Sequence, residues 1–508
     1  MMKGTTVFYT SVVILAFLVV IGVIAPDTVE QITTDMQAFI STSFGWYYLI
    51  LVTIITIVCL LLLISPVGRI RLGGQDDRPE FSRPTWISML FSAGMGIGLV
   101  FWGTAEPISH YAVSSPTGQE GTEQGITDAM RFTFFHWGIH AWAIYGIIGL
   151  VLAYFTFRHG ERGLISVTLK PLLGDRMDGP LGNIVDILSV LATVVGVATT
   201  LGFGAVQING GLSFLFDIPV NIFIQFLIIT IVTVLFMISA WTGLSKGIKI
   251  LSNTNMFLAG ILLIILFTVG PTVFILDIFT HSIGTYIHNL PAMSFRLAPF
   301  DEDIRGWIDS WTIFYWAWWI AWSPFVGIFI ARVSKGRSIR EFVFAVLFVP
   351  SIVGFFWFST FGGTAIMTEH KGIAEISTLA AEESLFGVFA QFPLGFLASI
   401  VALILIGTFF ITSADSGTFV LGMMTTNGSQ SPGKSIKLTW GVMLSATSLV
   451  LLYSGGLQAL ENTMIVAALP FSIIMALMTL SFLKALSTDA KTLGIGRIKK
   501  KKPKKAYR

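Results

Sequence analysis

The sequence predicts an all-α polytopic membrane protein with twelve transmembrane helices, and its composition is the first reason. Hydrophobic residues make up 54% of the 508 residues and charged residues only 12%, whereas soluble proteins carry about 25% charged residues. A spanning helix needs roughly 20 apolar residues, so the hydrophobic share is enough for about twelve spans. The single cysteine, Cys59, excludes an intrachain disulfide framework. The composition therefore excludes a soluble enzyme, a disordered chain and a nucleic-acid-binding protein.

Apolar runs place the spans along the chain. The first run follows Lys3 and has no small-residue cleavage site, which indicates a retained signal-anchor. The predicted spans are residues 7–25, 46–66, 86–108, 132–156, 182–208, 219–241, 255–279, 307–332, 342–366, 391–424, 438–455 and 460–484.

Charge between the spans predicts their orientation. Basic residues follow the even-numbered spans, as at Arg332, Lys335 and Arg337 after span 8, while odd-numbered exits are poor in bases or acidic. By the positive-inside rule, both termini are cytoplasmic. We expect a cytoplasmic N-terminus (1–6), a twelve-span domain (7–484) and a basic cytoplasmic tail (485–508).

The tail carries much of the positive charge. Residues 497–508 contain eight of the 31 Lys and Arg residues and no acid. Such a run is either a solvated topology signal or a contact to anionic lipid, to which each base near the surface contributes about 1 kcal/mol. The candidate regulatory residues are Lys499, Lys500, Lys501, Lys502, Lys504 and Lys505.

Span 3 contains three glycines at alternate positions, Gly94, Gly96 and Gly98. Each costs roughly 1 kcal/mol in a helix interior. Close packing of helices is one explanation. We favour a helix break, which membranes tolerate only where it is buried in protein or lines a cavity, and which is typical of transporter sites.

Span 8 contains five tryptophans in the twelve residues 311–322, where the average of 14 in 508 predicts about 0.3. Tryptophans usually form belts at the membrane interfaces. However, Trp318, Trp319 and Trp322 lie near mid-span and share a helical face with Tyr315. Clustered indole faces suit a quaternary ammonium, at about 0.5–2 kcal/mol per ring. Just below these residues, Pro324 of the Ser323-Pro324 pair has no N–H to donate, so a backbone group of the helix is left without its usual hydrogen bond. We therefore predict an aromatic cage.

Two further spans carry polar groups. His136 and His140 on span 4 are four residues apart; a metal or proton role is one interpretation, and hydrogen bonding between helices is the favoured one. Span 10 contains Thr412-Ser413 and Asp415, which suit a small hard cation or simply cap a helix break. No nucleotide-binding loop, zinc spacing or nucleophile elbow occurs, so the chain is not expected to be an enzyme or to need a cofactor.

Three stretches resemble the betaine/choline/carnitine transporter family, and most of all its sodium-coupled glycine betaine members. They are AGMGIGLVFWGTAEP (93–107), WTIFYWAWWIAWSPFVGIFIARVSKGRSIR (311–340) and TSADS (412–416). The resemblance extends over the twelve-span body. It implies a sodium-symporter-like core of two inverted five-helix repeats, spans 3–7 (about 86–279) and 8–12 (about 307–484), with spans 1 and 2 outside. It also implies a homotrimer in a bacterial cell membrane.

The same resemblance implies the binding residues. The trimethylammonium cage and its aromatic path would consist of Trp318, Trp319, Trp322, Trp137 and Tyr145. The backbone around Ala93 and Met95 would face the substrate. One sodium ion would be bound by Ser92, Met95, Phe409, Thr412 and Ser413, and a second by Thr193 and Phe325.

Two positions refine these expectations. Val197 stands one turn after Thr193, where the family pattern has a second threonine, so the second sodium site is weakened unless Thr199 or Thr200 substitutes. Gly98 lacks the acid that choline-transporting relatives tend to carry, which favours a zwitterion.

The predicted function is sodium-coupled symport of glycine betaine for osmoprotection. The alternatives are a choline or carnitine carrier, a proton-coupled carrier, or a sodium-independent exchanger of the same family. A channel or a membrane-embedded enzyme is disfavoured, since only His136 and His140 offer even a weak reactive pair.

Overall fold

A computed structural model describes residues 4–94, 96–242 and 245–495, without the side chains of residues 91–94 and 245–249. Within these residues every named element is a helix, and an isolated β-bridge joins Arg71 to Ser338. The predicted all-α class is thus confirmed. Helices satisfy their own backbone hydrogen bonds, as a chain within lipid must.

The N-terminal part of the chain forms the first eight α-helices. They are α1 (Thr6–Ile24), α2 (Pro26–Ile64), α3 (Arg83–Gly94), α4 (Ile97–Ala112), α5 (Glu123–Trp137), α6 (Ile139–Ala153), α7 (Lys170–Leu173) and α8 (Pro180–Phe216). The shorter turns among them are η1 (Pro66–Arg69), the π-turn η2 (Tyr154–Arg158), η3 (Ser166–Leu169) and η4 (Gly174–Asp178).

The C-terminal part forms the other nine α-helices. They are α9 (Ile222–Thr242), α10 (Ser245–Val269), α11 (Thr272–Ser294), α12 (Glu302–Ile308), α13 (Phe314–Val333), α14 (Ile339–His370), α15 (Ser384–Phe389), α16 (Gly395–Met424) and α17 (Lys434–Thr492). A π-turn, η5 (Asp309–Ile313), joins α12 to α13, and η6 (Ile376–Thr378) precedes α15.

Ten helical stretches of the described chain are long and apolar enough to cross a membrane. The longest, α17, contains the last two predicted spans and is interrupted at Gly455 and Gly456, where the backbone is not helical. Gly456 has φ +63°, which glycine adopts at little cost. The third predicted span is divided between α3 and α4, each shorter than the roughly 20 residues that a span needs. The count of twelve stays a prediction.

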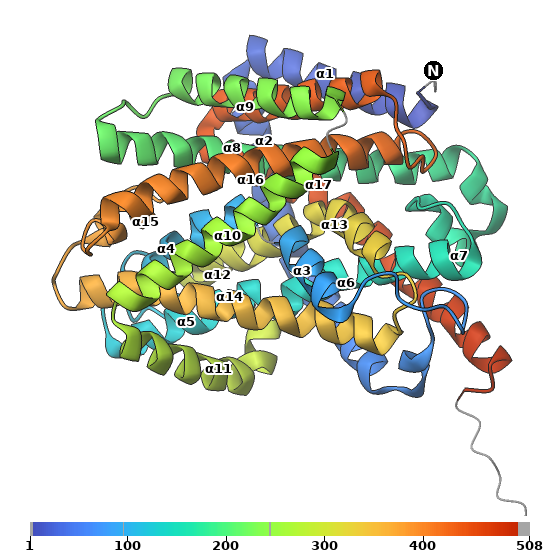
Figure 1. Cartoon of the computed structure of the whole chain (residues 1–508), viewed down its shortest axis with the longest axis horizontal. Helices are drawn as coiled ribbons and strands as arrows, with labels where there is room; N and C mark the ends of the chain where they lie inside the picture. The colour runs from blue at the N-terminus through green and yellow to red at the C-terminus, as the bar shows by residue number, and fades with distance from the viewer. Residues whose placement is uncertain (1–3, 95, 243–244, 496–508) are drawn as a thin grey trace, which may run out of the picture.

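Burial separates the interior helices from the peripheral ones. Nearly every residue of α6 and α13 is buried, whereas α1, α9 and α10 expose much of their apolar surface. Figure 1 agrees: α13 lies in the middle of the view, with α1 and α9 at its upper edge. A helix that is apolar on all sides and buried belongs to the core, so α13 is enclosed by protein instead of lipid. It packs against α6, α8 and α17.

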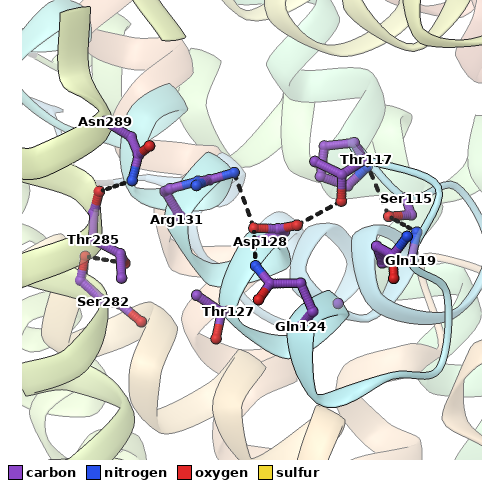
Figure 2. A network of polar contacts seen from close by, with 12 residues as sticks. Ser115, Thr117, Gln119, Gln124, Thr127, Asp128, Arg131, Ser282, Thr285 and Asn289 are labelled. Atoms are coloured by element: carbon purple, nitrogen blue, oxygen red, sulfur yellow. Dashed lines mark hydrogen bonds and ion pairs between the residues drawn. The ribbon is translucent and has the colours of Figure 1, made fainter. Parts of the chain in front are cut away.

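A polar network ties the loop between α4 and α5 to the start of α5 (Figure 2). Asp128 accepts hydrogen bonds from the Thr117 hydroxyl (2.5 Å) and the Gln124 amide (3.0 Å), and it pairs with Arg131 at 2.9 Å. Asp128 is buried, so these partners offset the loss of hydration. By the charge pattern of the loops, this is the predicted outer end of the bundle.

Arg296, between α11 and α12, lies over the same end. Its guanidinium donates to the Pro116 carbonyl and lies 4.9 Å from the centre of the Phe132 ring and 5.6 Å from that of Trp307. Burial lowers the pKa of Arg296 to about 10. The cation remains charged near neutral pH, and both aromatic faces stabilise it.

At the other end, the last turn of α17 is anchored to η2. The Asp489 carboxylate pairs with Arg158 and accepts a hydrogen bond from the Tyr154 hydroxyl at 2.8 Å. This anchor lies near the start of the predicted tail (485–508), of which residues 496–508 lie outside the described part of the chain.

Candidate substrate-binding site

The predicted break in span 3 is present. Helix α3 ends at Gly94, α4 begins at Ile97, and Gly96 between them is fully extended (φ −156°, ψ −157°). The α4 end exposes its first backbone N–H groups, which have no partner within the helix. This break lies against α13, because α3 and α13 are in contact.

Aromatic rings from three helices, α5, α6 and α13, meet beside the break. The rings of Trp318 and Trp319 are parallel, with centroids 5.2 Å apart and an interplanar angle of 4°. Trp137 of α5 stands almost perpendicular to Trp319 at 4.9 Å, and Tyr145 of α6 does so at 5.5 Å. The parallel pair of indoles and the two rings perpendicular to it together surround one small volume. The predicted convergence of span 4 and span 8 is therefore present.

Each of three indoles is fixed by a hydrogen bond to another helix. Trp319 Nε1 donates to the His136 carbonyl (2.9 Å), and Trp322 Nε1 donates to the Gly196 carbonyl (2.7 Å). Trp137 Nε1 donates to Glu106 (2.7 Å). A buried indole N–H without a partner is costly, so these bonds define the ring orientations.

The hollow enclosed by these rings has a volume of about 20 Å³, space for about one water molecule. Bound quaternary ammonium would therefore require the rings to separate. Its lining consists of Gly96, Ile97, Gly98, Leu99, Trp137, Tyr145, Thr200, Trp318, Trp319 and Trp322. The Tyr145 hydroxyl and Trp318 Nε1 are buried and have no hydrogen-bond partner among the described residues.

Gly98 is required for this close packing. A Cβ atom built on it would lie 2.9 Å from Cζ2 of Trp318, well inside van der Waals contact. Ala93, also predicted to face the substrate, is in the last turn of α3, but its side chain and all of Met95 lie outside the described residues. The described lining instead begins at Gly96.

Proline interrupts the hydrogen bonding of α13 below the cage, as predicted. Pro324 has no N–H to donate to the Ile320 carbonyl four residues earlier. The Ser323 hydroxyl donates to this carbonyl at 2.8 Å, so the helix continues through the proline. The Ile320 carbonyl, which has no backbone donor, therefore receives its hydrogen bond from a side chain of the same helix.

Three residues predicted for the first sodium site, Phe409, Thr412 and Ser413, lie together on α16. The Thr412 hydroxyl donates to the Phe409 carbonyl at 3.1 Å and accepts a hydrogen bond from the Asn255 amide at 3.1 Å. Asn255 of α10 was not predicted, and its Oδ1 is buried with no partner among the described residues. Ser413 follows directly, while the Ser92 side chain lies outside the described part.

The predicted second sodium site is less well supported. Thr193 donates to the Ser189 carbonyl (2.7 Å), and Phe325 packs edge-on against Trp322. Thr199 points to the Leu460 carbonyl at 3.4 Å, and Thr200 lines the cage. Thr199 lies two residues after Val197 and therefore on another face of the helix, whereas Thr200, three residues after it, shares its face and stays a candidate for the missing oxygen.

A larger hollow of about 300 Å³ lies on the predicted cytoplasmic side of the cage. Phe325 lines it and also contacts Trp322 of the cage. Arg332 and Asp415 contribute opposite charges to its wall, and Asp415 accepts a hydrogen bond from Ser239 at 2.8 Å.

Glu106 of α4 was missed by the sequence reasoning. It is the second-last residue of the stretch 93–107. The rule that an intramembrane acid suggests a functional role, which was applied to Asp415, would have found it. His136 shares a hydrogen bond with it (2.7 Å) and also bonds Thr312 (3.0 Å), while His140 bonds the Ser294 hydroxyl (3.0 Å). The two histidines are thus hydrogen-bonded between helices, as favoured.

A helical membrane bundle with a broken helix beside a buried aromatic cage defines a solute transporter and not an enzyme. The chain matches the family described as betaine/carnitine/choline family transporters over residues 6–491. It is 58% identical to the glycine betaine transporter OpuD of Bacillus subtilis over 489 residues, 96% of each chain.

Other relatives are also similar over nearly their full length. The chain is 43% identical to an ectoine/hydroxyectoine transporter of Virgibacillus pantothenticus, over 96% of this chain and 97% of the relative. It is 43% identical to a probable glycine betaine transporter of Desulfitobacterium hafniense, over 96% and 98%. The chain therefore belongs to the betaine/carnitine/choline transporter family.

Proposed function

We propose that this protein is a sodium-coupled symporter that takes up glycine betaine as a compatible solute. The observation that carries the proposal is the closed cage of Trp137, Tyr145, Trp318 and Trp319 against the break at Gly96. A quaternary ammonium donates no hydrogen bond, so aromatic faces in a dry site are its natural partners.

The polar groups of the cage favour a zwitterion over a plain cation. Tyr145 Oη and Trp318 Nε1 are buried donors without a partner among the described residues, and both can donate to a carboxylate. Position 98 is glycine and supplies no acid to neutralise a cation such as choline. The similarity to a glycine betaine transporter supports the same substrate, and the ectoine relative extends the candidates to other zwitterionic osmolytes.

Sodium is the proposed coupling ion, bound by Ser92, Met95, Phe409, Thr412 and Ser413. The adjacent oxygens of Phe409 and Thr412 support this proposal, because a small hard cation prefers oxygen ligands. The buried Asn255 Oδ1 adds an oxygen beside them. For the second site, Thr193 and Phe325 remain the proposed ligands, and Val197 weakens it, so we expect one tightly bound sodium ion.

The repeat architecture, the membrane orientation and the oligomeric state are proposed from the family resemblance and the loop charges. We infer two inverted repeats, 86–279 and 307–484, both termini in the cytoplasm, and a homotrimer in the cell membrane. The hollow below Phe325 is the proposed release path, because it begins at the ring that contacts Trp322.

A competition panel tests this function. Purified protein is titrated with glycine betaine, ectoine, choline and carnitine in sodium buffer and in sodium-free buffer of equal ionic strength. We expect glycine betaine to bind most tightly, and only with sodium. Tight binding of choline or carnitine, or binding unaffected by sodium removal, would instead support a choline or carnitine carrier or an exchanger. In a Thr412→Ala variant, betaine binding should depend less on sodium, and the protein should remain folded.

A further inference from the structure

Glu106 is a buried carboxylate that bonds to Trp137, one wall of the cage, and to Tyr315, which is stacked on the other wall. Its Oε2 accepts hydrogen bonds from Trp137 Nε1 (2.7 Å) and from the Tyr315 hydroxyl (2.5 Å). Its Oε1 lies 2.7 Å from His136 Nδ1 and 3.3 Å from His110 Nε2. Glu106 and both histidines are almost completely buried. One oxygen therefore faces the cage and the other faces the histidines.

A metal ion does not account for this geometry. Glu106, His110 and His136 each offer a ligand atom, and the three atoms lie within 4.8 Å of one another. Two ligands on one tetrahedral zinc ion, at about 2.0–2.2 Å from it, are separated by roughly 3.3 Å. The 2.7 Å between Oε1 and Nδ1 is instead a hydrogen-bond distance. The two groups are therefore partners in a hydrogen bond.

The two donors to Oε2 lie on different helices, and of the two only Trp137 lines the hollow. Trp137 belongs to α5 and stands perpendicular to Trp319, whereas Tyr315 belongs to α13 and is stacked on Trp318 and Trp319 with centroids about 6 Å away. The carboxylate thus fixes the angle between the perpendicular wall and the stacked wall. Without it, both a buried indole N–H and a buried phenol O–H would lose their acceptor.

The same bonds alter the rings electronically. A ring N–H or O–H that donates to a carboxylate is polarised, and the electron density on its π face increases. A more negative face attracts a quaternary ammonium more strongly. Glu106 does not itself line the hollow, so it acts on the ligand only through these rings.

We propose that Glu106 is a positioning residue of the cage: its carboxylate sets the orientation and the electron density of Trp137 and Tyr315, and thereby the affinity for quaternary ammonium. This inference rests on the proposed function of the cage. It assigns to the acid of span 3 a role in ligand affinity in addition to folding.

Glu106→Gln tests this role, because glutamine keeps the size but replaces one acceptor oxygen with a donor. We expect betaine affinity to fall roughly tenfold or more, by analogy with other hydrogen bonds to buried charged groups. Asp186→Asn is the matched control: Asp186 is also buried, but it bonds the Ser166 backbone and hydroxyl away from the cage. The control should lower the melting temperature and leave affinity within twofold of wild type.

A double-mutant cycle with Tyr315→Phe separates positioning from general destabilisation. If Glu106 acts through the Tyr315 hydroxyl, the double variant should lose less affinity than the product of the two single losses. Independent losses, or Glu106→Gln with wild-type affinity, would overturn the inference. If the wild-type protein binds no betaine, the proposed function is contradicted. If the wild type binds betaine and Glu106→Gln binds it with the same affinity, only this inference is contradicted.

Discussion

Individual cage residues are held by hydrogen bonds to other helices as well as by packing. Trp319 donates to the His136 carbonyl, and Trp322 donates to the Gly196 carbonyl. Each indole thus has its N–H satisfied at the edge of the site and its face left for a ligand. This division suits a cation that can only be stabilised by ring faces.

Replacing Trp319 or Trp322 with alanine should abolish measurable betaine binding and leave the protein folded. Each change removes a ring worth about 0.5–2 kcal/mol of cation–π attraction and leaves a cavity that no longer encloses the ligand. Isothermal titration of the purified variants measures the loss, with size-exclusion chromatography as the folding control. Near-wild-type affinity in either variant would refute the cage.

The cage residues on span 8 were predictable, because tryptophan is rare and its spacing on one helix is readable from sequence. The partners of those residues were not. Tyr315 and Glu106 are 209 positions apart in the chain, and no local pattern links them. Asn255, which bonds Thr412 from another helix, was missed for the same reason.

At the scale of helices, α8 and α13 approach each other closely at Gly196. A Cβ atom at this position would lie 2.7 Å from the Trp322 ring and 3.2 Å from the backbone of Ala321. Only glycine permits this approach and the hydrogen bond from Trp322 to its carbonyl. The register of α13 against α8 therefore depends on one missing side chain.

Gly196→Ala should lower betaine affinity at least tenfold, since the new methyl group displaces Trp322, and overpacking should cost about 1–3 kcal/mol in stability. Gly407→Ala is the matched control, because a Cβ atom on this α16 glycine has nothing within 4 Å. The control should bind normally and be unchanged or slightly more stable. Equal affinities for both variants would show that the α8–α13 contact does not position Trp322.

Element boundaries were only partly predictable. Hydropathy placed span 2 at residues 46–66, but α2 begins at Pro26, because polar residues extend a helix beyond the apolar run. The break at Gly96 was predicted, since alternating glycines are unfavourable in a helix. The π-turn η5 before the cage leaves no comparable sequence signal.

For the whole molecule, charge predicts an inner and an outer end, but not which helices are neighbours. The interior position of α13 follows from contacts with α6, α8 and α17, which come from distant parts of the chain. Its composition is no guide, because lipid and protein interior are equally apolar.

Deleting residues 497–508 should change the osmolality at which uptake is activated and leave betaine affinity unchanged. The eight basic residues are expected to contact anionic lipid, and the pair of Asp489 with Arg158 links the end of α17, which precedes them in the chain, to the transporter body. Uptake is measured at a series of external osmolalities in liposomes with and without anionic lipid. An identical activation profile would leave the tail as a topology signal.

Uptake of radiolabelled glycine betaine into proteoliposomes tests whether the protein is a sodium-coupled betaine symporter. Betaine carries no net charge, so its movement with sodium carries positive charge inward and is driven by the membrane potential. We expect uptake to be fast with an inward sodium gradient, faster still with a negative interior, and absent in Trp319→Ala. Uptake that is indifferent to sodium, or that persists without Trp319, would contradict this proposal.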